Sequence, residues 1–302
     1  MPAAPAFGRV LFVTRVFALG PAIIGRRKAL PPPHPSVQLD QGFLFAFLIT
    51  LAAGLSTGVG SVLGLLSKGF NPRLLSLSLS FSAGVMIFVS FVEIFPKARS
   101  SMVAVLGPQL GYGAALLAFF AGIGVVALID LLLPQHQLEP MVADAEGRPM
   151  GQRELMRTGL FTALAIAIHN FPEGLATFVG AIANPRLGVG IALAIAIHNI
   201  PEGLAISAPV YYATGDRRQA FALSFASGLA EPIGALVGYG LLRHFFSDVV
   251  FGVVFASVAG IMVYICFDEL LPAARRHGAH QVMIAGVMAG MAVMSLSLVL
   301  LS

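Results

Sequence analysis

The 302-residue chain is strongly apolar: 57% of its residues are hydrophobic, only 11% are charged, and its mean hydropathy is +0.88. Because an ordinary soluble domain carries about 25% charged residues, this composition excludes a soluble enzyme, a nucleic-acid-binding protein and a disordered protein. The net charge of +4 does not indicate a nucleic-acid partner, since the Lys and Arg residues of a membrane protein mainly set its orientation from the loops. The composition predicts an all-α polytopic protein embedded in a lipid bilayer.

Eight hydrophobic segments each have close to the roughly 20 residues that a helix needs to cross the hydrocarbon. We predict transmembrane helices at 42–67, 74–96, 109–133, 158–183, 188–212, 219–242, 249–271 and 282–302. The runs are continuous rather than alternating, which argues against a β-barrel. Residues 41–302 are therefore predicted to form one transmembrane domain.

The segment 1–40 differs in composition from the rest of the chain. It holds several Arg and Lys residues, a run of three prolines and no acid before Asp40. It is either a targeting segment or sequence upstream of a translation start that was placed too early. We expect it to lie outside the transport domain.

The distribution of Lys and Arg between the loops predicts the orientation of the helices. Most of them follow the first, third, fifth and seventh helices: Lys68, Arg73, Arg148, Arg153, Arg157, Arg217, Arg218, Arg275 and Arg276. Fewer follow the second, fourth and sixth helices: Lys97, Arg99, Arg186 and Arg243. The positive-inside rule places the first set in the cytoplasm, so that both ends of the domain face outside.

Two consecutive predicted helices carry a nearly identical segment. Residues 163–176 read ALAIAIHNFPEGLA and residues 192–205 read ALAIAIHNIPEGLA, so thirteen of fourteen positions match. Consecutive transmembrane helices run in opposite directions. The polar side chains of the two copies are therefore expected to face each other across a pseudo-two-fold axis in the membrane plane.

A second, weaker repeat relates the second and seventh predicted helices. Residues 83–98 (AGVMIFVSFVEIFPKA) and 259–274 (AGIMVYICFDELLPAA) match at seven of sixteen positions. Inverted repeats with polar, Pro-interrupted helices at the pseudo-axis are typical of transporters. The two repeats together predict two inverted three-helix bundles, helices one to three and six to eight, around helices four and five.

The first repeat places ionisable side chains in the middle of two apolar helices. They are His169, Asn170 and Glu173 in the fourth helix and His198, Asn199 and Glu202 in the fifth. In each copy the His and the Glu are four residues apart and share one helix face, with the Asn at an adjoining position. The proline between them also leaves a backbone carbonyl without its usual donor.

These residue types in this pattern suit a divalent transition metal. A carboxylate at the bilayer centre costs at least about 2.5–3.5 kcal/mol, and Glu231 in the sixth helix adds a third one. Imidazole, carboxylate and amide oxygen ligands fit Zn²⁺, Fe²⁺, Mn²⁺, Co²⁺ or Cd²⁺, and imidazole argues against Mg²⁺ or Ca²⁺. The alternative is that His and Asn only join helices by hydrogen bonds, and the duplication of the whole set favours a metal.

Other polar positions in the spans leave alternatives open. Met86 is either a packing residue or a soft thioether ligand. Glu93, Asp268 and Glu269 lie near the ends of their spans. Each is either solvated or paired at the interface, or lines a vestibule.

At this point the motifs carry a family resemblance. HNFPEG at 169–174 and HNIPEG at 198–203, followed by Glu231, resemble the metal-binding helices of the ZIP (Zrt/Irt-like) transporters. Together with DELLP at 268–272, they resemble a bacterial zinc-uptake branch of that family. The resemblance covers about residues 41–302.

The resemblance implies an eight-helix protein of the bacterial inner membrane, often a homodimer, which needs no catalytic cofactor and takes up Zn²⁺ and often Fe²⁺, Mn²⁺, Co²⁺ or Cd²⁺. It implies one metal site at His169, Glu173, His198 and Glu202, with Met86 at a position that contributes to it. It implies an adjoining site at Asn170, Glu173, Asn199, Glu202 and Glu231, so that the two shared glutamates bridge two metals.

We therefore predict a secondary metal transporter and not an enzyme. One rival is an intramembrane zinc hydrolase, which needs a general base beside a metal-bound water, as in H-E-x-x-H. Here the residue after each His is Asn. The other rival is a proton-coupled carrier of a non-metal solute, which lacks metal-dependent thermal stabilisation.

Overall fold

The computed structural model describes residues 39–66, 72–132, 152–242, 245 and 247–301. The segment predicted as a separate tail at 1–40 falls outside these ranges except for its last two residues, which begin the first helix. Most of the loop at 135–157 also falls outside them. All regular elements in the described ranges are helices, as the composition predicts.

Most of the described helices follow one another with connections of a few residues. They are α1 (Leu39–Leu66), α2 (Pro72–Val89), η1 (Ser90–Ile94), α3 (Phe95–Leu106), α4 (Pro108–Leu132), α5 (Gln152–Ala183), α6 (Pro185–Thr214), α7 (Arg217–Gly228), α8 (Ala230–Leu242), α9 (Asp248–Ile265), η2 (Cys266–Leu270), α10 (Leu271–His277) and α11 (His280–Leu301). The elements η1 and η2 are single turns of π-helix. Asn184 caps α6, because its side chain accepts hydrogen bonds from the backbone N–H groups of Arg186 and Leu187.

Seven helical stretches of the described residues are long and apolar enough to cross a membrane. They are Gly42–Leu66, Pro72–Leu106, Pro108–Leu131, Pro185–Thr214, Arg217–Leu241, Asp248–His277 and His280–Leu300, and they match seven of the eight predicted spans. The remaining predicted span corresponds to α5. This helix has 32 residues and carries the same polar motif as α6, but it is not among the seven stretches.

The second and seventh predicted spans continue beyond the prolines at which we predicted them to end. Helix runs on through Pro96 to Leu106 and through Pro272 to His277. In both places a π-turn stands directly before the proline-containing helix. A proline cannot donate to the carbonyl four residues earlier and its ring crowds that carbonyl. That carbonyl lies within the π-turn in each case, so the wider turn accommodates the proline without breaking the helix.

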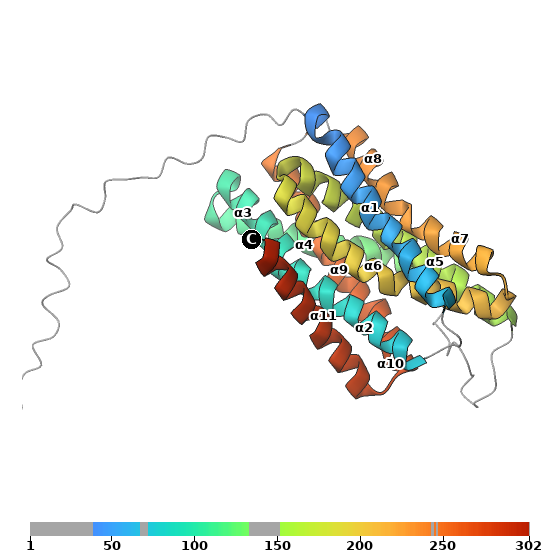
Figure 1. Ribbon diagram of the computed structural model, residues 1–302. Coiled ribbons are helices and arrows are strands. Elements are labelled where there is room, and N and C mark those ends of the chain that lie inside the picture. Colours follow the sequence, from blue (N-terminus) through green and yellow to red (C-terminus); the bar gives the residue numbers. More distant parts are fainter. Residues whose placement is uncertain (1–38, 67–71, 133–151, 243–244, 246, 302) are drawn as a thin grey trace, which may run out of the picture. The chain divides into compact units, whose positions relative to one another are not determined.

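The described helices pack in two groups (Figure 1). In the first group α1 lies against α5, α6, α7 and α8, and α5 lies against α6 and α8. In the second group α2 lies against α10 and α11, and α4 lies against α3 and α9. Contacts of α2 with α6 and of α5 with α9 join the groups.

This grouping differs from the predicted bundles of helices one to three and six to eight. Within the described residues, α1 does not pack against α2, α3 or α4. The reason is that a sequence repeat relates helices by symmetry. It therefore predicts which helices adopt equivalent conformations, and not which helices touch.

Two glycines let the first group pack backbone against backbone. A Cβ on Gly203 in α6 would overlap the carbonyl oxygen of Thr57 in α1, and a Cβ on Gly174 in α5 would overlap that of Glu231 in α8. Small residues permit such close approach between membrane helices. Both glycines are the last residue of the H-N-x-P-E-G motif. Each copy of the motif therefore ends at a close backbone contact, of α6 with α1 and of α5 with α8.

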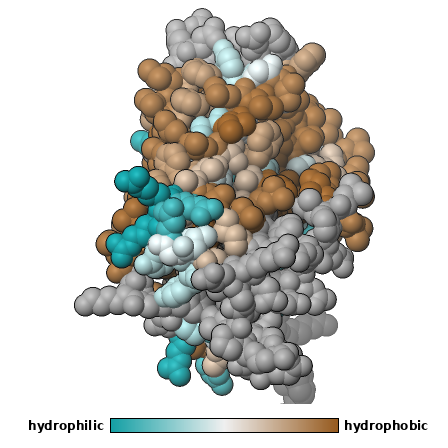
Figure 2. Space-filling model, turned by 90° about the vertical axis from the view of Figure 1, so that its right-hand side faces the viewer, coloured by the Kyte–Doolittle hydropathy of each residue, from teal (hydrophilic) through white to brown (hydrophobic). Residues whose placement is uncertain are grey.

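The outer surface is apolar over much of its area. The face shown in Figure 2 is mainly hydrophobic where it is coloured. Large exposed apolar side chains lie on α1, α4 and α11, among them Leu48, Leu63, Leu117, Phe120, Leu131, Leu296 and Val299. Such a surface requires a lipid environment.

Candidate metal centre

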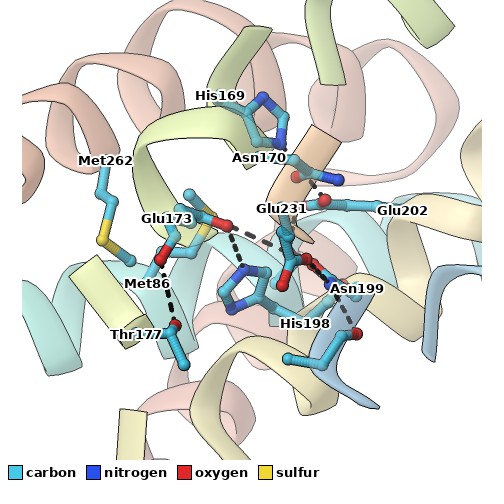
Figure 3. Close-up of polar contacts among 12 residues, drawn as sticks. Met86, His169, Asn170, Glu173, Thr177, His198, Asn199, Glu202, Glu231 and Met262 are labelled. Carbon is cyan, nitrogen blue, oxygen red and sulfur yellow. Dashed lines mark hydrogen bonds and ion pairs between the residues drawn. The ribbon is translucent and has the colours of Figure 1, made fainter. Parts of the chain in front are cut away.

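The two copies of the first repeat pair crosswise in the interior between α5 and α6. His169 Nε2 lies 3.2 Å from Glu202 Oε2, and His198 Nε2 lies 3.2 Å from Glu173 Oε2. The exposed fraction of each of the four residues is 0 or 1%. Because the helices run in opposite directions, each His reaches the Glu of the other helix (Figure 3).

The two asparagines of the motif are anchored through their amide nitrogens. Asn170 Nδ2 donates to the backbone carbonyl of Ser227 at 3.3 Å. Asn199 Nδ2 donates to the carbonyl of Ala53 at 3.1 Å and also to Glu231 Oε1. The Oδ1 atom of each asparagine has no hydrogen-bond partner among the described residues. Both amides are therefore oriented with their oxygen available to a cation.

Further ligand atoms at this centre lack a partner within the described residues. They are Nδ1 of His169 and of His198, Oε1 of Glu173 and Oε2 of Glu231. Since the large majority of buried polar atoms are hydrogen-bonded, their concentration in one place indicates a functional site. Imidazole nitrogen and carboxylate oxygen are also the ligand atoms that Zn²⁺ takes from proteins.

The described residues do not gather three His, Cys, Asp or Glu side chains around a single point. The crossed hydrogen bonds hold each His to a Glu instead. Of the three buried carboxylates, Glu231 lies within electrostatic reach of both Glu173 and Glu202. The two imidazoles can supply at most two positive charges. With both imidazoles neutral, a divalent cation between the helices would offset two of the three negative charges.

The second helix group reaches this centre through α2, and one of its contacts was missed in the sequence. Ser82 Oγ donates to Glu202 Oε1 at 3.2 Å and lies 3.3 Å from the carbonyl oxygen of His198. It also lies 4.0 Å from Met86 Sδ, so the structure brings the predicted Met86 to the edge of the site. Nothing in the sequence distinguishes Ser82 from the other serines of its helix.

The three acids that the sequence left open differ in position. Glu93 is near the surface and pairs with Lys97 one helical turn later, at 3.9 Å, which is the salt-bridge alternative. Asp268 is exposed. Glu269 is partly buried and lies within electrostatic reach of His169 and Glu202, which the sequence pattern did not indicate.

Comparison with known proteins gives the family. A sequence model described as "ZIP Zinc transporter" matches residues 134–298, which is more than half of the chain. The chain belongs to the ZIP zinc transporter family. The matched residues include both copies of the H-N-x-P-E-G motif, Glu231 and the second copy of the weaker repeat.

Individual ZIP relatives are similar over most of the chain. A protein of Chlorobium chlorochromatii named zinc transporter ZupT is 59% identical over 266 residues, which cover 87% of this chain and 99% of the relative. Proteins with the same name are 50% identical in Clostridium perfringens, over 85% of this chain and 96% of the relative, and 53% identical in Oceanobacillus iheyensis, over 86% and 98%.

Membership in the ZIP family agrees with two predictions from the sequence. The relatives are named as transporters, so the chain belongs to a family of transporters rather than enzymes. Together with the seven apolar helical stretches, the family also identifies a multi-pass membrane protein.

Proposed function

We propose that this chain is a secondary transporter that carries Zn²⁺ into the cytoplasm through the site between α5 and α6. The observation that carries the proposal is the crossed pairing of two buried His–Glu pairs, each at 3.2 Å, on adjacent membrane helices. The similarity to proteins named zinc transporters over 87% of the chain supports zinc as the cargo.

The first metal position in this proposal is formed by His169, His198, Glu173 and Glu202. Zn²⁺ separates the crossed pairs and takes imidazole nitrogen and carboxylate oxygen from both helices. These ligands replace most of the water around the ion, and the ion's charge balances the buried carboxylates. Met86 stands beside this position on α2.

A second, adjoining position uses the amide oxygens of Asn170 and Asn199 together with Glu231. Glu173 and Glu202 then bridge the two metals. Support comes from the anchoring of both amides through nitrogen and from the free Oδ1 and Oε2 atoms of these residues. The N/O ligand set also admits Fe²⁺, Mn²⁺, Co²⁺ and Cd²⁺.

The arrangement in the membrane that we propose has eight spans, with α5 as the span that its polar residues make less apolar. Both ends of the domain face outside a bacterial inner membrane, because Lys and Arg are most frequent in the stretches that follow the first, third, fifth and seventh predicted spans. Assembly into a homodimer is supported only by the family resemblance.

Release into the cytoplasm in this proposal follows a movement of one helix group relative to the other. The site residues come mainly from the first group (α1, α5, α6, α7, α8), and few elements link it to the second: α2 and α11 touch α6, and α5 touches α9. A rigid-body displacement of one group changes these contacts while the packing within each group persists.

Zinc flux into proteoliposomes containing the purified full chain tests the proposal. Glu173→Gln and Glu202→Gln keep the shape of the side chain and remove its charge, so each should abolish zinc uptake. Asp216→Asn is the matched control, because Asp216 is an exposed N-cap of α7 and Asn is an equally good cap. Unchanged zinc flux in either glutamate variant contradicts the site. A wild-type protein that moves no divalent metal, and whose stability does not respond to metal, contradicts the transport function.

A further inference from the structure

Three sulfur-containing side chains make contacts along the stretch from Ser82 to Ser90 in α2 and η1. Met86 Sδ lies 4.0 Å from Ser82 Oγ, and Met262 Sδ accepts a hydrogen bond from Ser90 Oγ at 3.7 Å. The thiol of Cys266 donates to the carbonyl of Ala83 at 3.6 Å. Met86, Met262 and Cys266 are each 0 or 1% exposed. We call these three residues the sulfur cluster.

The sulfur cluster is connected to the metal centre through α2. Ser82, which contacts Met86, also donates to Glu202 Oε1 at 3.2 Å. Figure 3 draws Met86 and Met262 in the same close-up as Glu173, whose buried Oε1 atom has no hydrogen-bond partner among the described residues. Cys266 lies within electrostatic reach of Glu173 and Glu202.

The donor atoms around the centre therefore differ between its two sides. The helices α5, α6 and α8 supply imidazole nitrogen and oxygen, whereas α2, α9 and η2 supply sulfur. Thioether and thiol sulfur are soft donors, which bind thiophilic ions well and Mn²⁺ or Mg²⁺ poorly. Burial among apolar side chains keeps water from competing with these weak ligands.

We propose that Met262 and Cys266, together with Met86, form a soft-donor wall of the transport site that bonds directly to thiophilic divalent cations, Cd²⁺ above all. The inference rests on the proposed metal-transport function and adds the determinant of selectivity. An ion held between α5 and α6 exchanges part of its N/O ligands for sulfur on this wall. Cd²⁺ gains from that exchange and Mn²⁺ does not.

The second repeat supplies a substitution that the local structure tolerates. Cys266 is the first residue of η2, and the equivalent residue of the other copy, the first of η1, is Ser90. Serine is therefore compatible with this position of the π-turn, so that Cys266→Ser removes the sulfur and preserves the conformation. Because the chain has one cysteine, this variant also removes every thiol.

X-ray absorption at the cadmium edge tests the wall directly on the purified full chain loaded with Cd²⁺. The wild type should show sulfur in the first coordination shell of the ion. The double variant Met262→Leu/Cys266→Ser should lose most of that sulfur and keep nitrogen and oxygen. Met102→Leu is the control for loss of a buried methionine, since Met102 lies on α3, where it packs against Gly252, and its substitution should leave the spectrum unchanged.

Metal competition against zinc flux gives a second, independent result. The double variant should need about tenfold more Cd²⁺ for half-inhibition of zinc uptake, while the Mn²⁺ requirement stays within about twofold. A first shell of only nitrogen and oxygen in the wild type, or an equal shift for both ions, overturns the wall and leaves the transport function intact. Failure of the wild type to bind any of the three metals overturns the proposed function itself.

Discussion

The two internal repeats differ in what their copies have in common: side chains and their contacts in the first repeat, and backbone conformation in the second. In α5 and α6 the side chains are nearly identical and make reciprocal contacts, with His169–Glu202 and His198–Glu173 both at 3.2 Å. In α2–η1 and α9–η2 the backbone is equivalent, down to the π-turn before each proline. The side chains of this second pair have diverged. Ser90 corresponds to Cys266, and Glu93 pairs with a lysine whereas Glu269 lies within electrostatic reach of His169 and Glu202.

The difference follows from what each pair surrounds. The helices of the first pair, α5 and α6, lie against each other, so each copy of the motif supplies one residue to each of the two His–Glu pairs. The members of the second pair also touch, through α2 with η2 and α9 with η1, but within the described residues no crossed ion pair joins them. Proline constrains the backbone alike in both copies, while their side chains can serve different tasks.

The largest expected effect comes from breaking the reciprocal pair on either side. His169→Ala and His198→Ala should each lower zinc flux by at least about a hundredfold, the upper end of what losing even an outer-shell metal partner costs. The two losses should be equal within about threefold, because the contacts are equivalent. The initial rate of radioactive zinc uptake into proteoliposomes measures the flux of each variant. A variant that retains normal uptake while the other fails would break the symmetry argument.

Alanine substitution of the glycines at close helix contacts in both repeats should give the next largest effect. A Cβ at Gly174 or Gly203 in the first repeat, or at Gly84 or Gly260 in the second, would overlap a backbone carbonyl. Alanine at each should lower the free energy of unfolding by about 1–3 kcal/mol or more. Thermal denaturation in detergent measures the loss.

Gly113→Ala in α4 is the matched control for these glycines, since a Cβ there meets nothing within 4 Å. It should be neutral or stabilise by up to about 1 kcal/mol. Tolerance of alanine at Gly203 would show that α1 and α6 are not packed as described.

A smaller effect should appear where the first repeat departs from its symmetry. Asn199 donates to both Ala53 and Glu231, whereas Asn170 donates to Ser227 alone. Asn199→Ala leaves a buried carboxylate without its donor, so it should destabilise the protein by about 1–3 kcal/mol more than Asn170→Ala. The difference in melting temperature between the two variants is the readout, and equal losses would contradict the assigned contacts.

The smallest effect concerns the two acids of the second repeat. The Glu93–Lys97 pair is partly exposed, and such i,i+4 pairs contribute about 0.3–0.5 kcal/mol, so Lys97→Gln should leave stability and zinc affinity nearly unchanged. Glu269→Gln removes a charge near His169 and should weaken zinc binding measurably. Isothermal titration of both variants compares them, and a larger effect for Lys97→Gln would reverse our assignment.

Much of the fold could be predicted because hydrophobic length and repeat symmetry are properties of the chain itself. The seven apolar helices and the central placement of His169, Glu173, His198 and Glu202 follow from them. The helices that pack against each other could not be predicted in this way. The packing of α1 depends on close backbone contacts, such as that of Gly203 with Thr57. The π-turns escaped prediction for a similar reason, since the prolines also permit a helix end.

The titratable residues of the site could be predicted from the sequence, whereas the groups that hydrogen-bond to the site residues could not. A buried His or Glu is rare enough in an apolar helix to be noticed. Ser82 and the carbonyls of Ala53 and Ser227 carry no such signal, since serine and backbone groups occur throughout membrane helices. Their roles depend on the distance between helices, which a single sequence does not encode.

Anomalous diffraction at the zinc edge from crystals of the zinc-loaded protein tests the central claim most directly. Our account predicts a peak between α5 and α6, within bonding distance of His169, His198, Glu173 and Glu202, which disappears in the Glu202→Gln variant. Zinc peaks confined to the surface, with both His–Glu pairs still intact at 3.2 Å, would contradict it.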